Sequence, residues 1–274
     1  MISICIKNND EKVLKYLTKK LAQSNFDEIC FSKHSFKIYD NIIIHYKGKK
    51  INEFYKFLGN VLTNIIIKFF EPVLIKKLIN LNYFYFDNND KRVVFEEYKL
   101  IRKNNKINKE LISVPLTDFL KNNKSIVLTG FIYFRLTDYV NILNTLISES
   151  VNQYIVDKEY LEFVGLLKSY VHSKAPESSV VNLIYINSEG ILLSDDGKII
   201  DLESFDSDYL SDISFSKNDY VLNTLVGILP EEIVLHLISP RDQFIKTIEL
   251  IFENRVKVCR SCELCKAYKM LDLN

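Results

Sequence analysis

The strongest constraint on the fold is a helical repeat of apolar residues in the middle of the chain. From Asn52 onward, apolar side chains recur at spacings of three and four for more than 100 residues. Examples are Phe54, Phe57, Leu58, Val61, Leu62 and Ile65, and later Ile142, Leu143, Leu146 and Ile147. This period places apolar residues on one face of a helix and predicts a mainly helical region. Pro72 and Pro115 are predicted to lie in first turns of helices, because proline is costly in a helix interior.

Strand patterns precede the helical region. Residues 2–6 alternate apolar and small polar side chains, which is typical of a strand. Residues 10–23 then follow a helical pattern, whose apolar face comprises Val13, Leu14, Leu17 and Leu21. Three more strands are predicted, at residues 28–31, 35–40 and 41–46. These patterns indicate a small α/β unit.

A second set of strand and helix patterns begins after residues 175–179, which break the helical repeat. Residues 180–186 form a β-branched and aromatic run that is typical of a buried strand. A hairpin is predicted from the apolar runs 191–194 and 198–200, on either side of Asp195-Asp196-Gly197. The remaining predicted elements are a helix at 218–228, a strand at 232–237, a helix at 240–252 and a strand at 255–258.

Taken together, the patterns predict an α+β fold. We expect three regions: a small N-terminal α/β unit over residues 1–50, a mainly helical region over 51–175, and a C-terminal α/β unit over 176–274 with a cysteine-rich tail. A chain of 274 residues can bury enough surface to fold without a metal or a disulfide.

The sharpest local motif is a C-x2-C-x2-C segment near the C-terminus. Cys259, Cys262 and Cys265 are spaced so that their thiolates can converge on one metal ion or cluster, and we predict them as metal ligands. Three soft ligands suit zinc or an iron–sulfur cluster. The fourth ligand has several candidate sources, namely Cys5, Cys30, a histidine such as His236, another subunit or solvent. Reversible disulfide exchange and thiols without a role are the alternatives.

Charge is divided unevenly along the chain, although the net charge is only +1. Residues 1–125 hold 23 Lys and Arg against 13 Asp and Glu, whereas residues 126–274 hold 13 against 22. The oppositely charged halves can complement each other, within one chain or in a homo-oligomer. A basic stretch can instead contact phosphates, and it comprises Arg92, Lys99, Arg102, Lys103, Lys106 and Lys109, with Tyr98 among them. No recognised nucleic-acid module accompanies it, so we expect a protein partner rather than nucleic acid.

Targeting signals are also lacking in the sequence. The first residues show no signal-peptide pattern. The apolar run at 61–81 carries Lys68, Glu71, Lys76 and Lys77, and such charges make insertion into a bilayer costly. The chain has five cysteines, and an odd number is not typical of the disulfide framework of a secreted protein. We therefore expect no integral membrane segment and a cytoplasmic location.

Three further segments of the chain form a recognisable set. They are the Gly-Phe-x-x-Phe-Arg-Leu-x-Asp-Tyr segment at 130–139, the segment at 156–163 with its continuation at 166–171, and the C-terminal segment at 251–259 with its Cys-Glu-Leu-Cys ending at 262–265. Together they resemble the YtxC-like family of sporulation proteins. The resemblance is strongest from about residue 95 onward and implies an endospore-forming bacterium and a role in or around sporulation. It implies no reaction, cofactor or catalytic residue.

Polar residues in these segments have two interpretations. Arg135 and Asp138 are three residues apart on a predicted helix and can form an ion pair, with Phe131, Phe134 and Tyr139 directed toward the core. Alternatively, Arg135, Asp138 and Glu159 line a polar pocket between helices.

The sequence contains no P-loop, no Gly-x-Ser-x-Gly and no Gly-x-Gly-x-x-Gly. We therefore expect a non-catalytic, sporulation-associated binding or structural factor whose C-terminal thiols hold a metal. Two alternatives stay open. One is a metal- or Fe–S-dependent enzyme acting on nucleic acid, and the other is an adaptor that senses redox state through the three cysteines.

Overall fold

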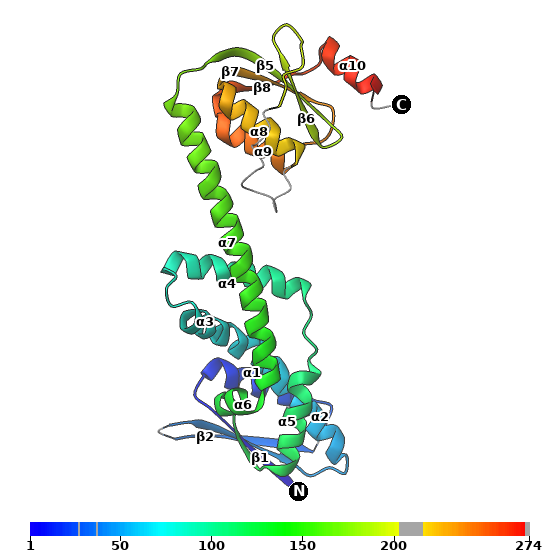
Figure 1. The fold of residues 1–274 in the computed structure, drawn as a ribbon. Helices are drawn as coiled ribbons and strands as arrows, with labels where there is room; N and C mark the ends of the chain where they lie inside the picture. Colours follow the sequence, from blue (N-terminus) through cyan, green and yellow to red (C-terminus); the bar gives the residue numbers. More distant parts are fainter. Residues whose placement is uncertain (27, 37, 203–215, 272–274) are drawn as a thin grey trace. The chain divides into compact units, whose positions relative to one another are not determined.

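The structure is a computed structural model that describes residues 1–26, 28–36, 38–202 and 216–271. The chain forms two compact units, Met1–Val156 and Asp157–Asn274, which we call the N-terminal unit and the C-terminal unit. Each unit combines helices with a four-stranded sheet (Figure 1). The predicted α+β class is therefore confirmed.

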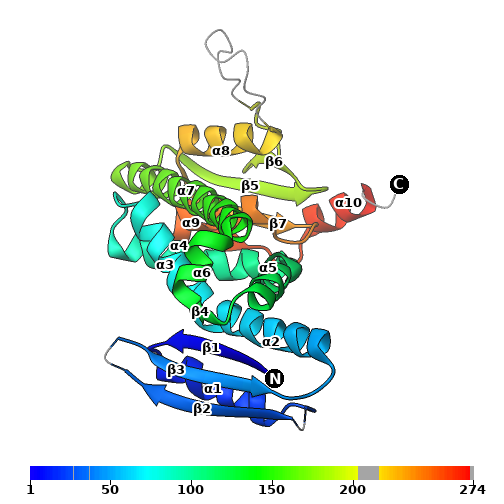
Figure 2. The same cartoon turned by 90° about the horizontal axis from the view of Figure 1, so that it is seen from below.

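The sheet of the N-terminal unit has the strand order β2-β3-β1-β4 (Figure 2). Strand β1 (Ile2–Asn8) pairs antiparallel with β3 (Asp40–Tyr46), and β3 pairs antiparallel with β2 (Ile29–Ser35). The short β4 (Ser125–Val127), which the sequence pattern does not predict, pairs parallel with β1. Alternate residues of β1 and β3 are buried, so one face of the sheet adjoins the core.

Helix α1 (Glu11–Ala22) follows β1 and packs into the same core. Asp10 caps it, because its carboxylate accepts the backbone N–H of Lys12 at 2.8 Å. The four residues predicted for the apolar face are all buried, namely Val13, Leu14, Leu17 and Leu21. The amphipathic pattern therefore identifies this helix and its buried side correctly.

The strand predicted at residues 35–40 is not formed. Ser35 is the last residue of β2 and faces Asp40, the first residue of β3, across the hairpin. Residues 36 and 38–39 lie between the two strands and belong to neither. Phe36 and Ile38, whose apolar side chains suggested a strand, are 65% and 71% exposed. The hairpin therefore has two longer strands where the sequence pattern indicates three short ones.

The helical region predicted from the apolar repeat is present, interrupted by β4. Its elements in the N-terminal unit are α2 (Ile51–Ile65), the π-helical turn η1 (Ile66–Phe70), α3 (Glu71–Asn82), α4 (Asn88–Asn104), α5 (Glu110–Asn122), α6 (Leu128–Arg135) and the first part of α7 (Thr137–Ser173). In η1 the backbone N–H of Glu71 bonds to the carbonyl of Ile66, five residues earlier. This wide turn joins α2 to α3 without a break in the helical chain.

The two prolines differ in outcome. Pro72 lies in the first turn of α3, as predicted. Pro115 lies inside α5, which begins at Glu110, so its predicted position in a first turn is wrong. Proline at this position removes the N–H that would bond to the carbonyl of Leu111, and its ring crowds the same carbonyl. Burial of Ile112, Leu116 and Leu120 favours continuing the helix through this position.

One helical stretch of the described chain, Ile51–Asn82, is long and apolar enough to cross a membrane when judged by length and composition. More than half of its apolar window, 56%, is buried inside the protein. The core helix of a folded unit has this same character.

The C-terminal unit contains a sheet of order β6-β5-β7-β8. Strand β5 (Ser178–Ile186) pairs antiparallel with β6 (Glu189–Ser194) and parallel with β7 (Pro230–Leu237), which pairs parallel with β8 (Val256–Val258). Asn187 and Ser188 join β5 to β6 with φ angles of 51° and 63°. Two successive residues with positive φ are typical of a two-residue hairpin turn.

Helices α8 (Lys217–Ile228) and α9 (Gln243–Phe252) contribute to the core of this unit, as do Val164 and Val171 of α7. Both helices match the sequence prediction within a few residues. The hairpin predicted around Asp195-Asp196-Gly197 is reduced to a turn with an isolated bridge between Leu193 and Ile199. Ser194 and Lys198 both contact the Asp196 carboxylate, so this acidic pair belongs to a turn.

Candidate functional site

The three predicted cysteine ligands lie where the last strand of the C-terminal unit ends. Cys259 follows β8, Cys262 precedes α10 (Glu263–Leu271), and Cys265 lies in the first turn of that helix. The backbone N–H of Cys259 donates to the carbonyl of Leu235 at 2.9 Å, which extends the pairing of β8 with β7 by one residue. His236 is the next residue of β7, so this pairing brings the histidine to the cysteine segment.

His236, Cys259, Cys262 and Cys265 form one cluster in which the potential ligand atoms all lie within 4.8 Å of one another. The Cys265 Sγ is 3.8 Å from the Sγ atoms of both Cys262 and Cys259. The His236 Nδ1 is 3.3 Å from the Cys265 Sγ and 3.4 Å from the Cys262 Sγ. The structure therefore brings all three predicted cysteines together and adds His236, one of the candidate fourth ligands.

These distances fit a single tetrahedral ion. With Zn–S bonds of about 2.3 Å and Zn–N bonds of about 2.05 Å, tetrahedral geometry separates two sulfurs by about 3.8 Å and a sulfur from a nitrogen by about 3.6 Å. The observed S–S distances of 3.8 Å equal the first value, and the N–S distances of 3.3 and 3.4 Å are slightly shorter than the second. Such a cluster can bind a metal ion such as zinc without a large rearrangement.

Asn182 of β5 orients the histidine. The Nε2 of His236 lies 3.0 Å from the Asn182 Oδ1, and a protonated Nε2 donates to this amide oxygen. The lone pair of Nδ1 is then directed toward the sulfurs, which is the tautomer that metal ligation through Nδ1 requires. Burial lowers the pKa of His236 and so favours the neutral ring that a metal needs.

The environments of the thiols differ. Burial, together with hydrogen bonds to Cys262 and Cys265, raises the pKa of Cys259 to about 11. Burial alone would raise the pKa of Cys262, but hydrogen bonds from the backbone amides of Cys265 and Leu264 lower it below its usual value. These amides lie at the start of α10, where the exposed N–H groups stabilise a thiolate. Cys262 therefore ionises more readily than Cys259.

The remaining cysteines lie outside this cluster. Cys5 is on β1 and Cys30 is on β2, both in the N-terminal unit. All five cysteines are free thiols in the structure. Neither Cys5 nor Cys30 belongs to the cluster of four, so the fourth position falls to His236 among the described residues.

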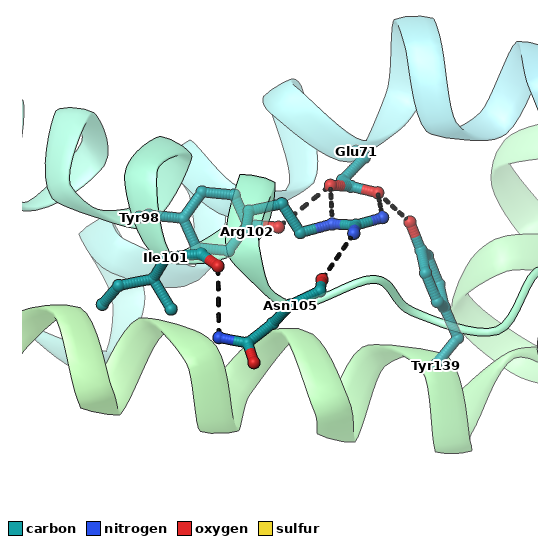
Figure 3. Close-up of polar contacts among 6 residues, drawn as sticks. All are labelled: Glu71, Tyr98, Ile101, Arg102, Asn105 and Tyr139. Carbon is teal, nitrogen blue, oxygen red and sulfur yellow. Dashed lines mark hydrogen bonds and ion pairs between the residues drawn. The ribbon is translucent and has the colours of Figure 1, made fainter.

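A second polar cluster lies in the N-terminal unit around the buried carboxylate of Glu71 (Figure 3). Arg102 donates its Nε–H to the Glu71 Oε1 at 3.0 Å, and Tyr98 donates its hydroxyl to the same oxygen at 3.0 Å. Tyr139 donates its hydroxyl to the other oxygen, Oε2. Burial and the neighbouring carboxylate raise the pKa values of both tyrosines above the ordinary range, so each stays a hydrogen-bond donor.

This network changes the interpretation of the basic stretch. Arg102 and Tyr98, two residues at its centre, are directed at Glu71, and the Arg102 Nη1 also donates to the carbonyl of Asn105 at 3.0 Å (Figure 3). Lys99 pairs with Glu96 at 2.7 Å. The cluster therefore joins α3, α4 and α7, and the Arg102 guanidinium stabilises this contact between helices.

Residues of the Gly-Phe-x-x-Phe-Arg segment take different roles from those expected. Arg135 ends α6 and Asp138 lies in the first turn of α7, so the two do not share a helix, and both are exposed. Phe131 and Tyr139 are buried as predicted, but Phe134 is 82% exposed. Glu71 is the buried polar residue that the sequence pattern did not reveal, because it stood only as an unfavourable charge in an apolar run. The sequence signal for such a network was the charge of Glu71 at a helical position where the apolar repeat places the core, because a buried charge needs partners.

Fold and cluster together define a two-unit α+β protein with a Cys3His group at the end of a parallel strand pair. The family model of the YtxC-like family matches residues 56–257, and the chain belongs to this family. The uncharacterized protein YtxC of Bacillus subtilis (strain 168) is 24% identical over 225 residues, which cover 70% of this chain and 77% of that protein. No solved structure matches. The family match includes Asn182 and His236 and ends two residues before Cys259.

We expect Asn182→Ala to weaken zinc binding by about 10- to 100-fold, because the His236 ring would lose the partner that orients it. Competition with a chromophoric chelator measures this affinity. Asn152→Ala, an exposed change on α7, is the control and should bind zinc as the wild type does. Equal affinities for wild type and Asn182→Ala would contradict the orienting role.

We expect Glu71→Gln to lower the free energy of unfolding by about 3 kcal/mol, because Arg102 would keep its charge in a largely buried position without a carboxylate. Glu53→Gln removes an exposed carboxylate that pairs with Lys50 and should cost less than about 1 kcal/mol. Guanidinium denaturation followed by circular dichroism compares the two. Similar losses of unfolding free energy in both variants would show that the Glu71 network stabilises the fold no more than an exposed ion pair does.

Proposed function

We propose that this chain is a non-catalytic, sporulation-associated binding factor whose C-terminal unit is stabilised by one zinc ion. The observation that carries the proposal is the convergence of His236, Cys259, Cys262 and Cys265. Four protein ligands complete a tetrahedral zinc site and leave no position for water or substrate. Zinc sites that are closed in this way stabilise structure, whereas catalytic zinc sites keep an open position.

The dimensions of the cluster favour one ion over an iron–sulfur cluster. Two ligands on opposite sides of a single ion are separated by at most two bond lengths, about 4.6 Å for zinc and sulfur. The ligand atoms here lie within 4.8 Å of one another. Several iron atoms between the sulfurs would require the ligands to move apart.

A zinc ion at this place would connect α10 to the paired strands β7 and β8. It would link β7, through His236, to the residue after β8 and to the first turn of α10. Helix α10 has Cys265 as a buried residue, and residues 263–264 and 266–270 are exposed or half-buried. The ion would therefore fix the position of α10 on the C-terminal unit. The fixed helix would then offer a defined surface to a protein partner.

The proposed location is the cytoplasm, and the proposed setting is sporulation. Thiolate ligands require a compartment in which cysteines stay reduced, and all five cysteines are free. The sporulation setting is supported by the similarity to the YtxC-like family, and the structure adds no reaction to it.

Elemental analysis of protein purified without oxygen tests the proposal. We expect about one zinc per chain, and Cys262→Ser should lower this content severely while leaving most of the fold intact, because the core is large without the metal. Cys30→Ser removes an exposed thiol of the N-terminal unit and should retain the zinc.

Other outcomes would replace the proposal. Iron with charge-transfer absorption would favour the cluster-dependent enzyme. Metal-free protein whose thiols oxidise and are restored by reductant would favour the redox adaptor. Unchanged zinc content in Cys262→Ser would remove Cys262 from the ligand set.

A further inference from the structure

A cavity of 330 Å³ lies between α3 and α4 in the N-terminal unit, away from the Glu71 carboxylate. Its lining contains four cationic side chains, those of Lys76, Lys91, Arg92 and Lys99. Glu96 is the acidic residue among the described residues that line it, and it pairs with Lys99. The cavity therefore has a strong excess of positive charge in a chain whose total net charge is only +1.

Phe95 holds two of these cations in place. Its ring centre is 5.0 Å from the Lys76 Nζ and 4.7 Å from the Lys99 Nζ. Ammonium groups above an aromatic ring are attracted to it without being neutralised, because the ring carries no net charge. The ring therefore holds both ammonium groups at the lining of the cavity and does not itself cancel their charge.

The remaining lining groups suit the same type of ligand. Asn80 and Asn88 contribute amide groups that can donate hydrogen bonds to oxygen atoms. The Arg92 Nη2 donates to the Asn89 side chain at 3.0 Å, which leaves other guanidinium N–H groups able to donate to a phosphate. Arginine and lysine together bind phosphate oxygens more strongly than neutral donors do.

The charge excess is greatest at this cavity and smaller beside it. A neighbouring cavity of 260 Å³ shares Phe95 and Lys99 with the first, but Glu71 lies in its lining and is paired with Arg102. A ligand-sized pocket with concentrated charge favours a compact polyanion over a polymer that follows an extended basic track.

We propose that the cavity between α3 and α4 binds a small polyphosphate ligand, a molecule with a pyrophosphate or triphosphate group, through Lys76, Lys91, Arg92 and Lys99. This site is independent of the zinc site, because it lies in the other unit.

Isothermal titration calorimetry of the full-length chain with inorganic tripolyphosphate at low ionic strength tests this proposal. We expect saturable binding to one site that weakens as salt is added. The double variant Lys76→Gln/Arg92→Gln should lose about tenfold or more in affinity. Both residues are exposed, so circular dichroism should show an unchanged fold.

The double variant Lys12→Gln/Lys19→Gln is the matched control, because it also removes two positive charges, from exposed positions of α1 in the same unit. Its affinity should stay within about twofold of the wild type. Equal weakening by Lys12→Gln/Lys19→Gln, or no binding of tripolyphosphate by the wild type, would overturn the proposal. Tight binding of single-stranded DNA that tripolyphosphate does not displace would overturn it in favour of a polymer.

Discussion

The candidate metal centre depends on the register in which β8 pairs with β7. Leu235 faces Val258, and the N–H of Cys259 continues the ladder to the carbonyl of Leu235. A strand shifted by one residue reverses the side on which every side chain lies. His236 and the first cysteine therefore meet only in this register, and the turn from Cys259 to α10 then brings the other two thiols to the same point.

The N-terminal unit shows a comparable dependence on one buried group. Glu71 is 6% exposed and lies among apolar helices, where an unpaired carboxylate would be costly. Arg102 and two tyrosine hydroxyls satisfy its oxygens from α4 and α7. Since each partner comes from a defined position on its helix, the network favours one arrangement of the three helices among those that apolar packing alone would permit.

Local periodicity was enough to predict most of the fold. The buried face of α1 and the strands β1, β5 and β7 follow from side-chain spacing, and so does the grouping of three cysteines. Long-range pairing was not predictable in this way. His236 was one candidate among several because strand register decides which residue meets the cysteines, and β4 is too short to show a pattern. The partners of Glu71 are 27 to 68 residues away in sequence.

The π-helical turn η1 also has a consequence for helical phase. If the α-helical period of Leu58, Leu62 and Ile65 continued unchanged, positions near 69, 72 and 76 would be buried. The wide turn changes the helical phase, and the buried apolar positions of α3 are Leu74, Ile75 and Ile79. Lys76, which the uninterrupted period would direct into the core, instead faces outward at the basic cavity. A local widening of the backbone thus decides which side of α3 carries charge.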